Sequence, residues 1–338
     1  MRICIVGAGA IGGYLGGRLA LAGEEVTFVA RGSNLAAINA DGMRMRHGDG
    51  REEIVRGVRA VSGFEGNGAF DVVILTLKAH QLPEVAARIE SLCHEDTVVM
   101  PLQNGIPFWY FNGHGGALEG RAVESVDPGG RIRDAIPARR IVGCVVFVAA
   151  RRIGPGVVMH MGNERLPLGE LDGAKSERIA RIAAAFERAG FQAPVLDDIR
   201  AEVWLKLWGN ASFNPISALT HAGLSDICAD VDGRELVVRM MGETQAVAEK
   251  LGIAFRVTID KRIDGAARVG RHKTSMLQDV EAGQPLEIDA LTGSVVELGT
   301  LLGVPTPTLR AIYQATKLLD RALRMENAAL RAMPLARS

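Results

Sequence analysis

Cysteine and aromatic residues are scarce in this chain of 338 residues, and its formal net charge is zero. The four cysteines are scattered without a close pair, so we expect reduced core thiols and neither disulfides nor zinc ligands. The seven histidines are equally dispersed, and no metal site is predicted. A balanced charge argues against a general nucleic-acid binder or a binder of anionic membranes.

Long hydrophobic runs are also missing, and the sequence does not open on a charged leader followed by an apolar stretch. We therefore expect neither secretion nor membrane insertion, and predict a cytoplasmic protein. What the chain does contain is 48% hydrophobic residues, 23% charged residues and 40 glycines without a collagen-like period. This composition is typical of a soluble globular protein, and the length suffices for two domains.

The first motif is a glycine-rich turn between an apolar segment, residues 2–6, and a stretch with helical periodicity. A strand, a glycine turn and a helix in this order are typical of dinucleotide binding, because the turn and the helix N-terminus accept a pyrophosphate. The alternative is a purely structural glycine turn. We assign to cofactor binding the residues of this turn, Gly7, Ala8, Gly9, Ala10, Ile11 and Gly12.

The end of the second predicted strand, residues 25–29, indicates which dinucleotide fits. A carboxylate there would hydrogen-bond the adenosine ribose of NAD. This chain instead has Arg31, followed by Ser33 and Asn34. A guanidinium beside hydroxyl and amide donors suits a 2′-phosphate, so the sequence favours NADP. An ordinary surface arginine is the alternative.

Polar residues follow two further predicted strands, residues 71–77 and 97–102. Side chains at the carboxyl ends of parallel strands face the ligand crevice. Lys78 could therefore contact a cofactor phosphate or ribose, and Asn104 could reach the nicotinamide and a substrate oxygen. A lysine at a helix start and an asparagine in a turn are the structural alternatives.

The stretch 204–219, WLKLWGNASFNPISAL, places three polar side chains in an otherwise apolar segment. In a helix, Lys206, Asn210 and Asn214 recur every fourth residue and share one face. We predict a site wall of one amine and two amides, with a solvated helix face as the alternative. Pro215 is expected to kink or restart the helix.

The order of these segments predicts an α/β Rossmann-like N-terminal domain, residues 1–196, that binds NADP, and an all-α C-terminal helical domain, residues 197–338, that serves substrate binding, catalysis and dimerisation. Residues 108–137 are long for a loop and predict a flap over the site or a surface excursion. Ser275 and Glu287 are further candidates beside predicted helix starts, where helix capping is the alternative.

Taken together, the chain resembles the ketopantoate reductase family, also called 2-dehydropantoate 2-reductases, over nearly its whole length. The motifs that carry the resemblance are GAGAIGG, TLKAHQ, QNG, AARR at Ala149 to Arg152, KLxxNxxxNP, and SMLQD with a later Glu-Ile-Asp. The resemblance implies NADPH-dependent reduction of 2-dehydropantoate to pantoate, a step of pantothenate and coenzyme A biosynthesis. Its small-molecule partner would be a 2-keto acid.

The resemblance also implies roles for single residues. Lys206 would protonate the substrate carbonyl oxygen while NADPH delivers hydride to the same carbon. Glu287 would assist catalysis by helping to close the site and to anchor cofactor or substrate, and near Lys206 it would hold the lysine charged. Such a lysine suits the chemistry, because hydride addition builds negative charge on that oxygen. Asn210 and Asn214 would bind a substrate hydroxyl, and Ser275 would contact the substrate. The family's cofactor-contacting positions match Lys78, Asn104, Ala150 and Glu287, and Asn104 also faces the substrate.

Two other functions stay open. Residues 221–226 lack an asparagine that some family members carry for the substrate's terminal hydroxyl, so a different 2-keto acid is one alternative. A non-catalytic NADP-sensing module is the other, although it would have no use for Lys206 together with Glu287. The apolar helices of the second domain could pair, which suggests a homodimer.

Overall fold

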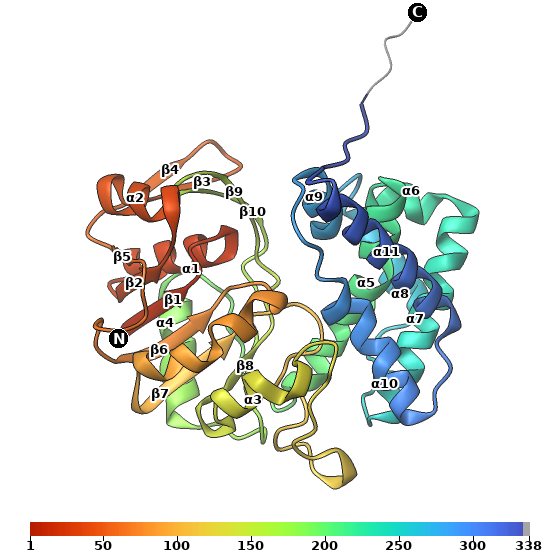
Figure 1. Cartoon of the computed structure of the whole chain (residues 1–338), viewed down its shortest axis with the longest axis horizontal. Coiled ribbons are helices and arrows are strands. Elements are labelled where there is room, and N and C mark those ends of the chain that lie inside the picture. The colour runs from red at the N-terminus through yellow and green to blue at the C-terminus, as the bar shows by residue number, and fades with distance from the viewer. Residues whose placement is uncertain (334–338) are drawn as a thin grey trace, which may run out of the picture. The chain divides into compact units, whose positions relative to one another are not determined.

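The structure, a computed structural model, describes residues 1–333, and these form two compact units (Figure 1). The assignment of residues 1–196 to cofactor binding and 197–338 to substrate binding concerns function and stays a prediction; residues 334–338 lie outside the described residues. The first unit comprises Met1–Gln103, Pro107–Ala122 and Gly129–Glu202, and the second comprises Asn104–Ile106, Val123–Pro128 and the chain from Val203 onward.

A parallel sheet forms the centre of the first unit, with its strands in the order β5 (Arg59–Val61), β2 (Glu25–Val29), β1 (Arg2–Val6), β6 (Phe70–Leu75) and β7 (Cys93–Pro101) (Figure 1). Most residues of β1 and β6 are apolar and buried, as is typical of parallel strands that are covered on both faces. The strand order reverses beside β1. In such sheets ligands bind beyond the carboxyl ends of the strands at this point.

A second sheet of the same unit has the strand order β4 (Glu52–Val55), β3 (Met43–Arg46), β10 (Val157–Gly162) and β9 (Ala149–Gly154). Helix α1 (Ala10–Leu21) packs between the two sheets. A Cβ on Gly16 would stand 2.4 Å from the ring of Phe28 in the first sheet, and one on Gly17 would stand 2.6 Å from the sulfur of Met45 in the second. Glycine at these positions therefore lets one helix touch both layers.

The remaining elements of the first unit are helices, 3-10 helices and a further pair of short strands. Helix α4 begins after Ser176, whose side chain accepts a hydrogen bond from the backbone N–H of Ile179. These elements are the helices α2 (Gly32–Asp41), α3 (Arg131–Ala135) and α4 (Glu177–Arg188), the short strands β8 (Val142–Cys144) and β11 (Leu168–Glu170), and the 3-10 helices η1 (Ala79–Glu84), η2 (Ala86–Leu92), η3 (Gly116–Leu118) and η5 (Ala138–Arg140). The chain passes from the second unit to the first within η4 (Pro128–Gly130).

The start of the segment 108–137 is part of the core, so the prediction of a flap or a surface excursion is wrong there. Its four consecutive aromatic residues, 108–111, are almost fully buried. The guanidinium of Arg200 fixes the segment, because it donates to the carbonyl oxygens of Tyr110, Leu171 and Asn112 at 2.8, 2.7 and 2.5 Å. Burial lowers the pKa of Arg200. Large aromatic side chains favour burial strongly enough to place a long connection inside the fold.

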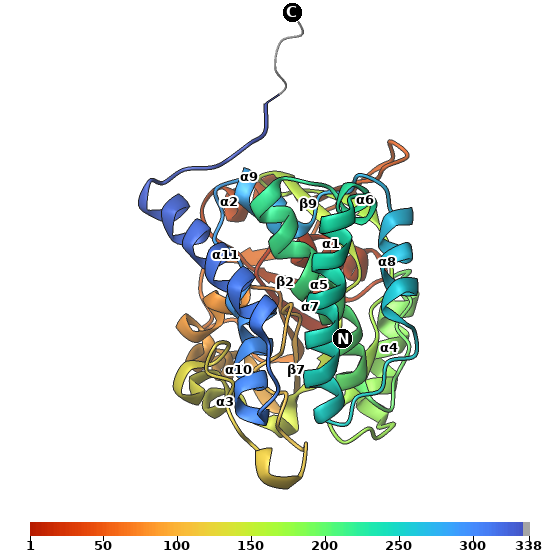
Figure 2. The ribbon, with the colours of Figure 1, turned by 90° about the vertical axis from the view of Figure 1, so that its right-hand side faces the viewer.

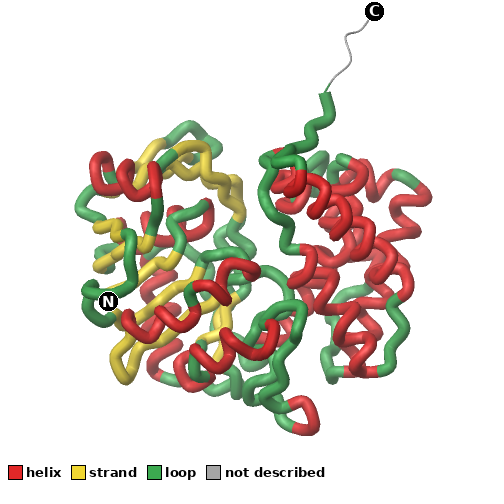
Figure 3. Tube along the Cα trace, viewed as in Figure 1, coloured by secondary structure: helices red, strands yellow, loops and turns green. Residues whose placement is uncertain are grey.

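The second unit is helical, and all the described strands belong to the first unit (Figures 2 and 3). Helix α7 contacts four of its neighbours, α6, α8, α10 and α11. The parallel sheet with helices and the helical region that follows it confirm the predicted fold class. The elements are α5 (Ile199–Thr220), α6 (Leu224–Ala229), α7 (Val231–Lys250), α8 (Ile259–Arg268), α9 (Ser275–Glu281), the π-helical turn η6 (Asp289–Gly293), α10 (Ser294–Leu302) and α11 (Pro307–Met325).

Helix α5 continues through Pro215, so the predicted restart of the helix is wrong, whereas a kink at this proline stays a prediction. A proline has no N–H to offer the carbonyl of the residue four positions earlier, here Ala211. The hydroxyl of Thr292 in η6 donates to that carbonyl oxygen at 3.1 Å instead. A hydrogen bond from a distant turn thus replaces the missing helical one and ties η6 to α5.

Within residues 1–333, no helix is both long enough and apolar enough to span a bilayer. A cytoplasmic location stays a prediction.

We expect the stability of the first unit to depend on Glu24. This buried carboxylate accepts hydrogen bonds from the amino group of Met1 and from Arg188, the latter at 2.7 Å. Burial alone would raise the pKa of Glu24, but the two cations outweigh it and lower the pKa below its usual value. Glu24→Gln should therefore reduce the free energy of unfolding at pH 7 by about 1–2 kcal/mol in urea titrations.

The pH dependence of this effect has a definite sign. A lowered folded-state pKa stabilises the fold at all pH values above the unfolded-state pKa of about 4.3, and the stabilisation disappears as pH falls through the folded-state pKa. The difference in the free energy of unfolding between wild type and Glu24→Gln should thus be constant near neutral pH and shrink below about pH 4. A difference that persisted unchanged at pH 3 would contradict an ionic origin.

Candidate active site

The glycine turn after β1 is held by contacts with the end of β6. Gly7 has a φ of +106°, which favours glycine, and the hydroxyl of Thr76 lies 2.5 Å from its carbonyl oxygen. A Cβ on Gly12 would stand 2.0 Å from that same oxygen. Gly9 differs from both, because it is exposed and a Cβ there would meet no heavy atom within 4 Å. Protein packing explains Gly7 and Gly12 but not Gly9, which is the N-cap of α1 and leaves open space beside the turn.

A pocket of about 290 Å³ opens beside this turn. Of the residues predicted to bind cofactor, Gly7, Ala8, Gly9 and Arg31 line it, whereas Ala10, Ile11, Gly12, Lys78 and Ala150 do not. The size is at the lower end for small-molecule sites, which suits one end of a dinucleotide. The other lining residues are Val6, Val29, Ala30, Asn34, Phe64, Leu77, Gln81, Glu84, Val85 and Arg152.

Asn34 has a structural role, which corrects its interpretation as a ligand donor. Its side chain is buried; its amide nitrogen donates to the carbonyl oxygen of Ala8 at 2.5 Å, and its amide oxygen accepts from the N–H of Gly156 at 2.7 Å. Both ends of the amide are therefore occupied by backbone. Of the polar residues after β2, Arg31 and Ser33 stay exposed.

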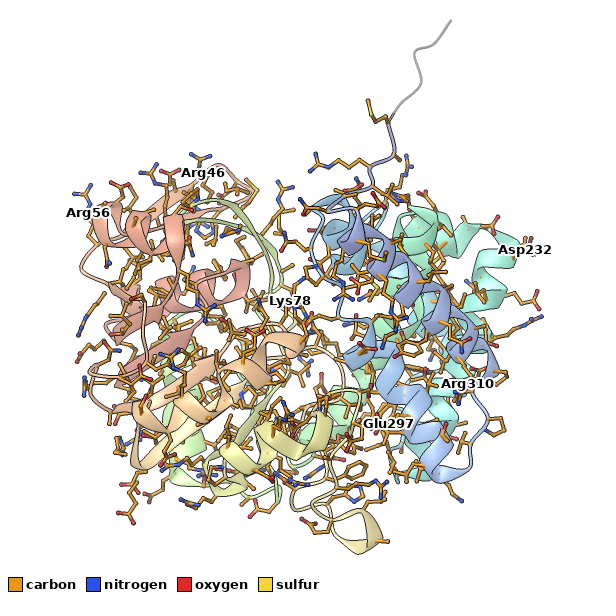
Figure 4. The ribbon with its side chains drawn as sticks, in the orientation of Figure 1. Arg46, Arg56, Lys78, Asp232, Glu297 and Arg310 are labelled. Carbon is orange, nitrogen blue, oxygen red and sulfur yellow. The ribbon has the colours of Figure 1, made fainter. Side chains whose placement is uncertain are left out.

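Two further candidates of the first unit lie outside that pocket. Lys78 immediately precedes η1 and is half-buried (Figure 4). Ala150 is half-buried in β9. Their predicted contacts with cofactor stay predictions.

Three predicted site residues form a hydrogen-bonded chain within the second unit. The ammonium of Lys206 donates to the amide oxygen of Asn104 at 2.7 Å, and the amide nitrogen of Asn104 donates to a carboxylate oxygen of Glu287 at 3.3 Å. The three side chains come from α5, from the loop after β7 and from the segment before η6, and all are half-buried. Since only the amide nitrogen can donate to Glu287, this carboxylate turns the amide oxygen toward Lys206.

The π-helical turn η6 packs against the backbone next to Asn104 and supports the hydrogen-bonded chain. Gly105, next to Asn104, has a φ of +89° and lies so close to η6 that a Cβ would stand 2.0 Å from the carbonyl oxygen of Ala290. The N–H of Ile106 donates to the same oxygen at 3.2 Å. Single π-helical turns are frequent at functional sites. Here the turn fixes the backbone on both sides of the Asn104–Glu287 hydrogen bond.

Sequence reasoning gave no role to three residues that hold η6 in place. Asp289 accepts hydrogen bonds from Tyr313 and Lys317 of α11 at 2.5 and 2.6 Å, and Lys317 also donates to the Tyr313 oxygen at 2.9 Å. Burial and the hydrogen bond to Asp289 raise the pKa of Tyr313, so that it remains a donor. The spacing of Tyr313 and Lys317, one helical turn apart, was visible in the sequence, but their partner was not.

The other predicted substrate residues, Asn210, Asn214 and Ser275, differ in how exposed their side chains are. Asn210 and Asn214 lie one helical turn apart in α5, and within residues 1–333 neither amide makes a side-chain hydrogen bond, although Asn214 is only 5% exposed. The polar atoms of the Asn214 amide are not fully buried, so a ligand or water can reach them. Ser275 is exposed at the start of α9, and the cap of that helix is Thr274, which excludes the capping alternative for Ser275.

Glu297 illustrates a carboxylate with a structural role in the same unit. From α10 it accepts the backbone N–H groups of Glu124 and Ser125, both at 2.7 Å (Figure 4). These two backbone hydrogen bonds explain the carboxylate at position 297 without a ligand.

Comparison with known proteins supports a common origin along most of the chain. The family described as Ketopantoate reductase PanE/ApbA matches residues 3–173, and its C-terminal domain matches residues 198–320. A 2-dehydropantoate 2-reductase of Mesorhizobium japonicum is 50% identical over 320 residues, 94% of this chain and 98% of the relative.

Solved structures show the same fold. One from Ralstonia solanacearum MolK2, assigned to the ketopantoate reductases, has 42% identity and a TM-score of 0.90, and the match covers 95% of this chain and 98% of that one. A D-mandelate dehydrogenase solved with NADH and anilino(oxo)acetate has a TM-score of 0.81 over 96% of this chain and 100% of that one, but its 24% identity shows the shared fold alone.

The parallel sheet with its glycine turn and the matching family model place the chain among the NAD(P)-dependent oxidoreductases. The chain belongs to the ketopantoate reductase family. The resemblance seen in the sequence motifs is thereby confirmed, as is the prediction that the protein is an enzyme.

Proposed function

We propose that this enzyme reduces 2-dehydropantoate to pantoate with NADPH, and that residues 1–196 bind the cofactor and residues 197–338 the substrate. The observation that carries the proposal is the chain from Lys206 through Asn104 to Glu287, with distances of 2.7 and 3.3 Å. The names of the relatives support the substrate, and Arg31 at the pocket supports the phosphorylated cofactor.

Lys206, Asn104 and Glu287, the three residues of the hydrogen-bonded chain, have separate tasks in the proposed reaction. NADPH, when bound, supplies the hydride to the carbonyl carbon. Lys206 stabilises the negative charge that grows on the carbonyl oxygen and gives it a proton. Asn104 holds the ammonium in one direction through its amide oxygen, and Glu287 fixes the rotamer of that amide. The lysine is thereby oriented before the substrate arrives.

The two amides of α5 would bind the substrate's hydroxyl without adding charge. Asn210 and Asn214 make no side-chain hydrogen bond within residues 1–333, so both amide nitrogens and both amide oxygens are available. A hydroxyl can donate to one amide oxygen and accept from the other amide nitrogen. This pairing would distinguish hydroxylated 2-keto acids from purely aliphatic ones, because an aliphatic substrate would cover both amides without pairing them.

The proposal is tested by cofactor oxidation with a panel of 2-keto acids, 2-dehydropantoate among them, in the presence of NADPH or NADH. We expect the highest kcat/KM with 2-dehydropantoate and NADPH. Preference for another 2-keto acid would replace the substrate and keep the proposed mechanism. Tight NADPH binding without turnover of any keto acid would instead identify a sensing module.

We expect Gly9→Ala to separate cofactor binding from folding. A methyl group at this position meets no protein atom within 4 Å, so the melting temperature should stay within about 2 °C of wild type. The same methyl group would stand where the pyrophosphate approaches the backbone, so the Kd for NADPH should rise at least about tenfold. Isothermal titration calorimetry and a thermal melt measure both quantities.

The matched control for this variant is Gly242→Ala in α7, which also has no heavy atom within 4 Å of the added Cβ. It should leave the Kd for NADPH unchanged. Equal affinities of Gly9→Ala and wild type for NADPH would exclude the glycine turn as the pyrophosphate site.

A further inference from the structure

The second arginine of the AARR motif lies at the same pocket as Arg31. Arg152 belongs to β9 in the second sheet, and Arg31 precedes α2 at the end of a strand of the first sheet, yet both line the one pocket beside the glycine turn. The chain thus brings two guanidiniums to one place from positions 121 residues apart, as their numbers show. Sequence reasoning gave a role only to the first of them.

Strand pairing shows why Arg152 points to this side. Residues directly opposite each other in an antiparallel pair have side chains on the same face, and Arg152 pairs with Val158 of β10. Val158 is buried against α1, since a Cβ on Gly13 would stand 2.9 Å from it. Arg152 therefore projects from the sheet face that covers α1, as Ala150 does two residues earlier. Its neighbour Arg151 projects from the opposite face.

The charges at this pocket are not balanced by the protein. Within residues 1–333, neither Arg31 nor Arg152 makes a side-chain hydrogen bond or an ion pair. Glu84 is the one carboxylate among the lining residues, and it forms no ion pair with either arginine. Two guanidiniums that share a pocket repel each other unless an anion lies between them. The arrangement suits a group with more than one negative charge and several acceptor oxygens, which describes a phosphate monoester.

We propose that Arg152 and Arg31 together bind the 2′-phosphate of NADPH, so that Arg152 is a second determinant of cofactor specificity. The inference rests on the proposed use of NADPH. Arg31 follows β2, where the adenosine ribose lies in sheets of this type, while the pyrophosphate lies at the glycine turn. A guanidinium donates two parallel hydrogen bonds to a phosphate, and two guanidiniums can contact different oxygens of one phosphate.

The test compares the Kd values of NADPH and NADH, which differ only in the 2′-phosphate, by calorimetry on the wild type and on Arg152→Ala. We expect the variant to bind NADPH roughly 10- to 100-fold more weakly and to bind NADH within about twofold of wild type. Adenosine 2′-monophosphate is a second probe. Arg152→Ala should bind it more weakly than wild type, as for NADPH, but should bind adenosine 5′-monophosphate with unchanged affinity.

Two further variants sharpen the test. Arg151→Ala removes the same charge from the opposite face of β9 and should leave all four affinities unchanged. Arg152→Lys keeps the charge but not the planar fork, and should restore part of the NADPH affinity, which a merely structural role for the arginine would not predict. It also serves if Arg152→Ala fails to fold.

The outcomes are distinct. If Arg152→Ala weakens NADPH and NADH equally, or weakens neither, the role of Arg152 at the 2′-phosphate is refuted while NADPH dependence stands. If the wild type itself binds NADPH no better than NADH and reduces 2-dehydropantoate with both, the proposed NADPH dependence is refuted, and the inference with it.

Discussion

Lys206→Ala should lower kcat for 2-dehydropantoate reduction by about 10²- to 10⁴-fold, the range typical of a lost general acid. The variant removes the group that stabilises and protonates the developing oxyanion, and the hydrogen bond of 2.7 Å to Asn104 shows that the amine is already oriented. The glycine turn and Arg31 are untouched, so the Kd for NADPH should stay within about twofold. Single-turnover kinetics under saturating cofactor, combined with calorimetry, separate the chemical step from binding.

Lys250→Ala is the matched control, because Lys250 ends α7, is exposed, and lies outside the hydrogen-bonded chain. It should retain wild-type kcat. Substantial kcat in Lys206→Ala would refute the role of this lysine as proton donor, whichever keto acid is the substrate. Lost NADPH binding in Lys206→Ala would point to a role in holding the cofactor.

Gly105→Ala should combine lost stability with lost activity. A Cβ there would stand 2.0 Å from the carbonyl oxygen of Ala290, and the φ of +89° strains any side chain. Either backbone segment must move, which breaks the hydrogen bond from Ile106 to Ala290 and displaces Asn104 from Lys206. We expect a loss of about 2–4 kcal/mol in the free energy of unfolding and at least a tenfold drop in kcat. Urea titrations and steady-state kinetics measure the two effects.

The control for Gly105→Ala is Gly252→Ala in the same unit. Gly252 has a similar φ of +83°, but a Cβ there meets no atom within 4 Å. The difference between the two variants therefore reports the contact with η6 and not the left-handed backbone. Equal stability and equal kcat in the two variants would show that this contact does not position Asn104.

Sequence reasoning succeeded where local pattern decides structure. The apolar strand, the glycine turn and the helix near Gly7 are contiguous, and the stripe of Lys206, Asn210 and Asn214 needs only helical spacing to share a face. The predicted restart of the helix at Pro215 was wrong, because the carbonyl oxygen that the proline leaves free accepts a hydrogen bond from Thr292, far along the chain. Local rules describe what a proline removes, but not which distant hydroxyl replaces it.

The same limit applies to the sites themselves. Whether Asn34 binds a ligand or the backbone depends on Gly156, and whether Arg152 faces solvent or the pocket depends on the pairing of β9 with β10. The aromatic run 108–111 carried a signal for burial, yet the length of its segment suggested a loop. Residues with backbone or side-chain partners far along the chain are the ones that sequence pattern alone assigns least well.

The position of Asn34 has a practical consequence for protein engineering. A common approach to exchanging cofactor preference is to replace the whole segment after the second strand with that of a differently specific enzyme. In this protein such a graft would remove the amide that ties Ala8 to Gly156 and would loosen the turn that the new cofactor must use. Positions 31 and 33 are open to redesign, whereas position 34 belongs to the scaffold and should be retained in every variant.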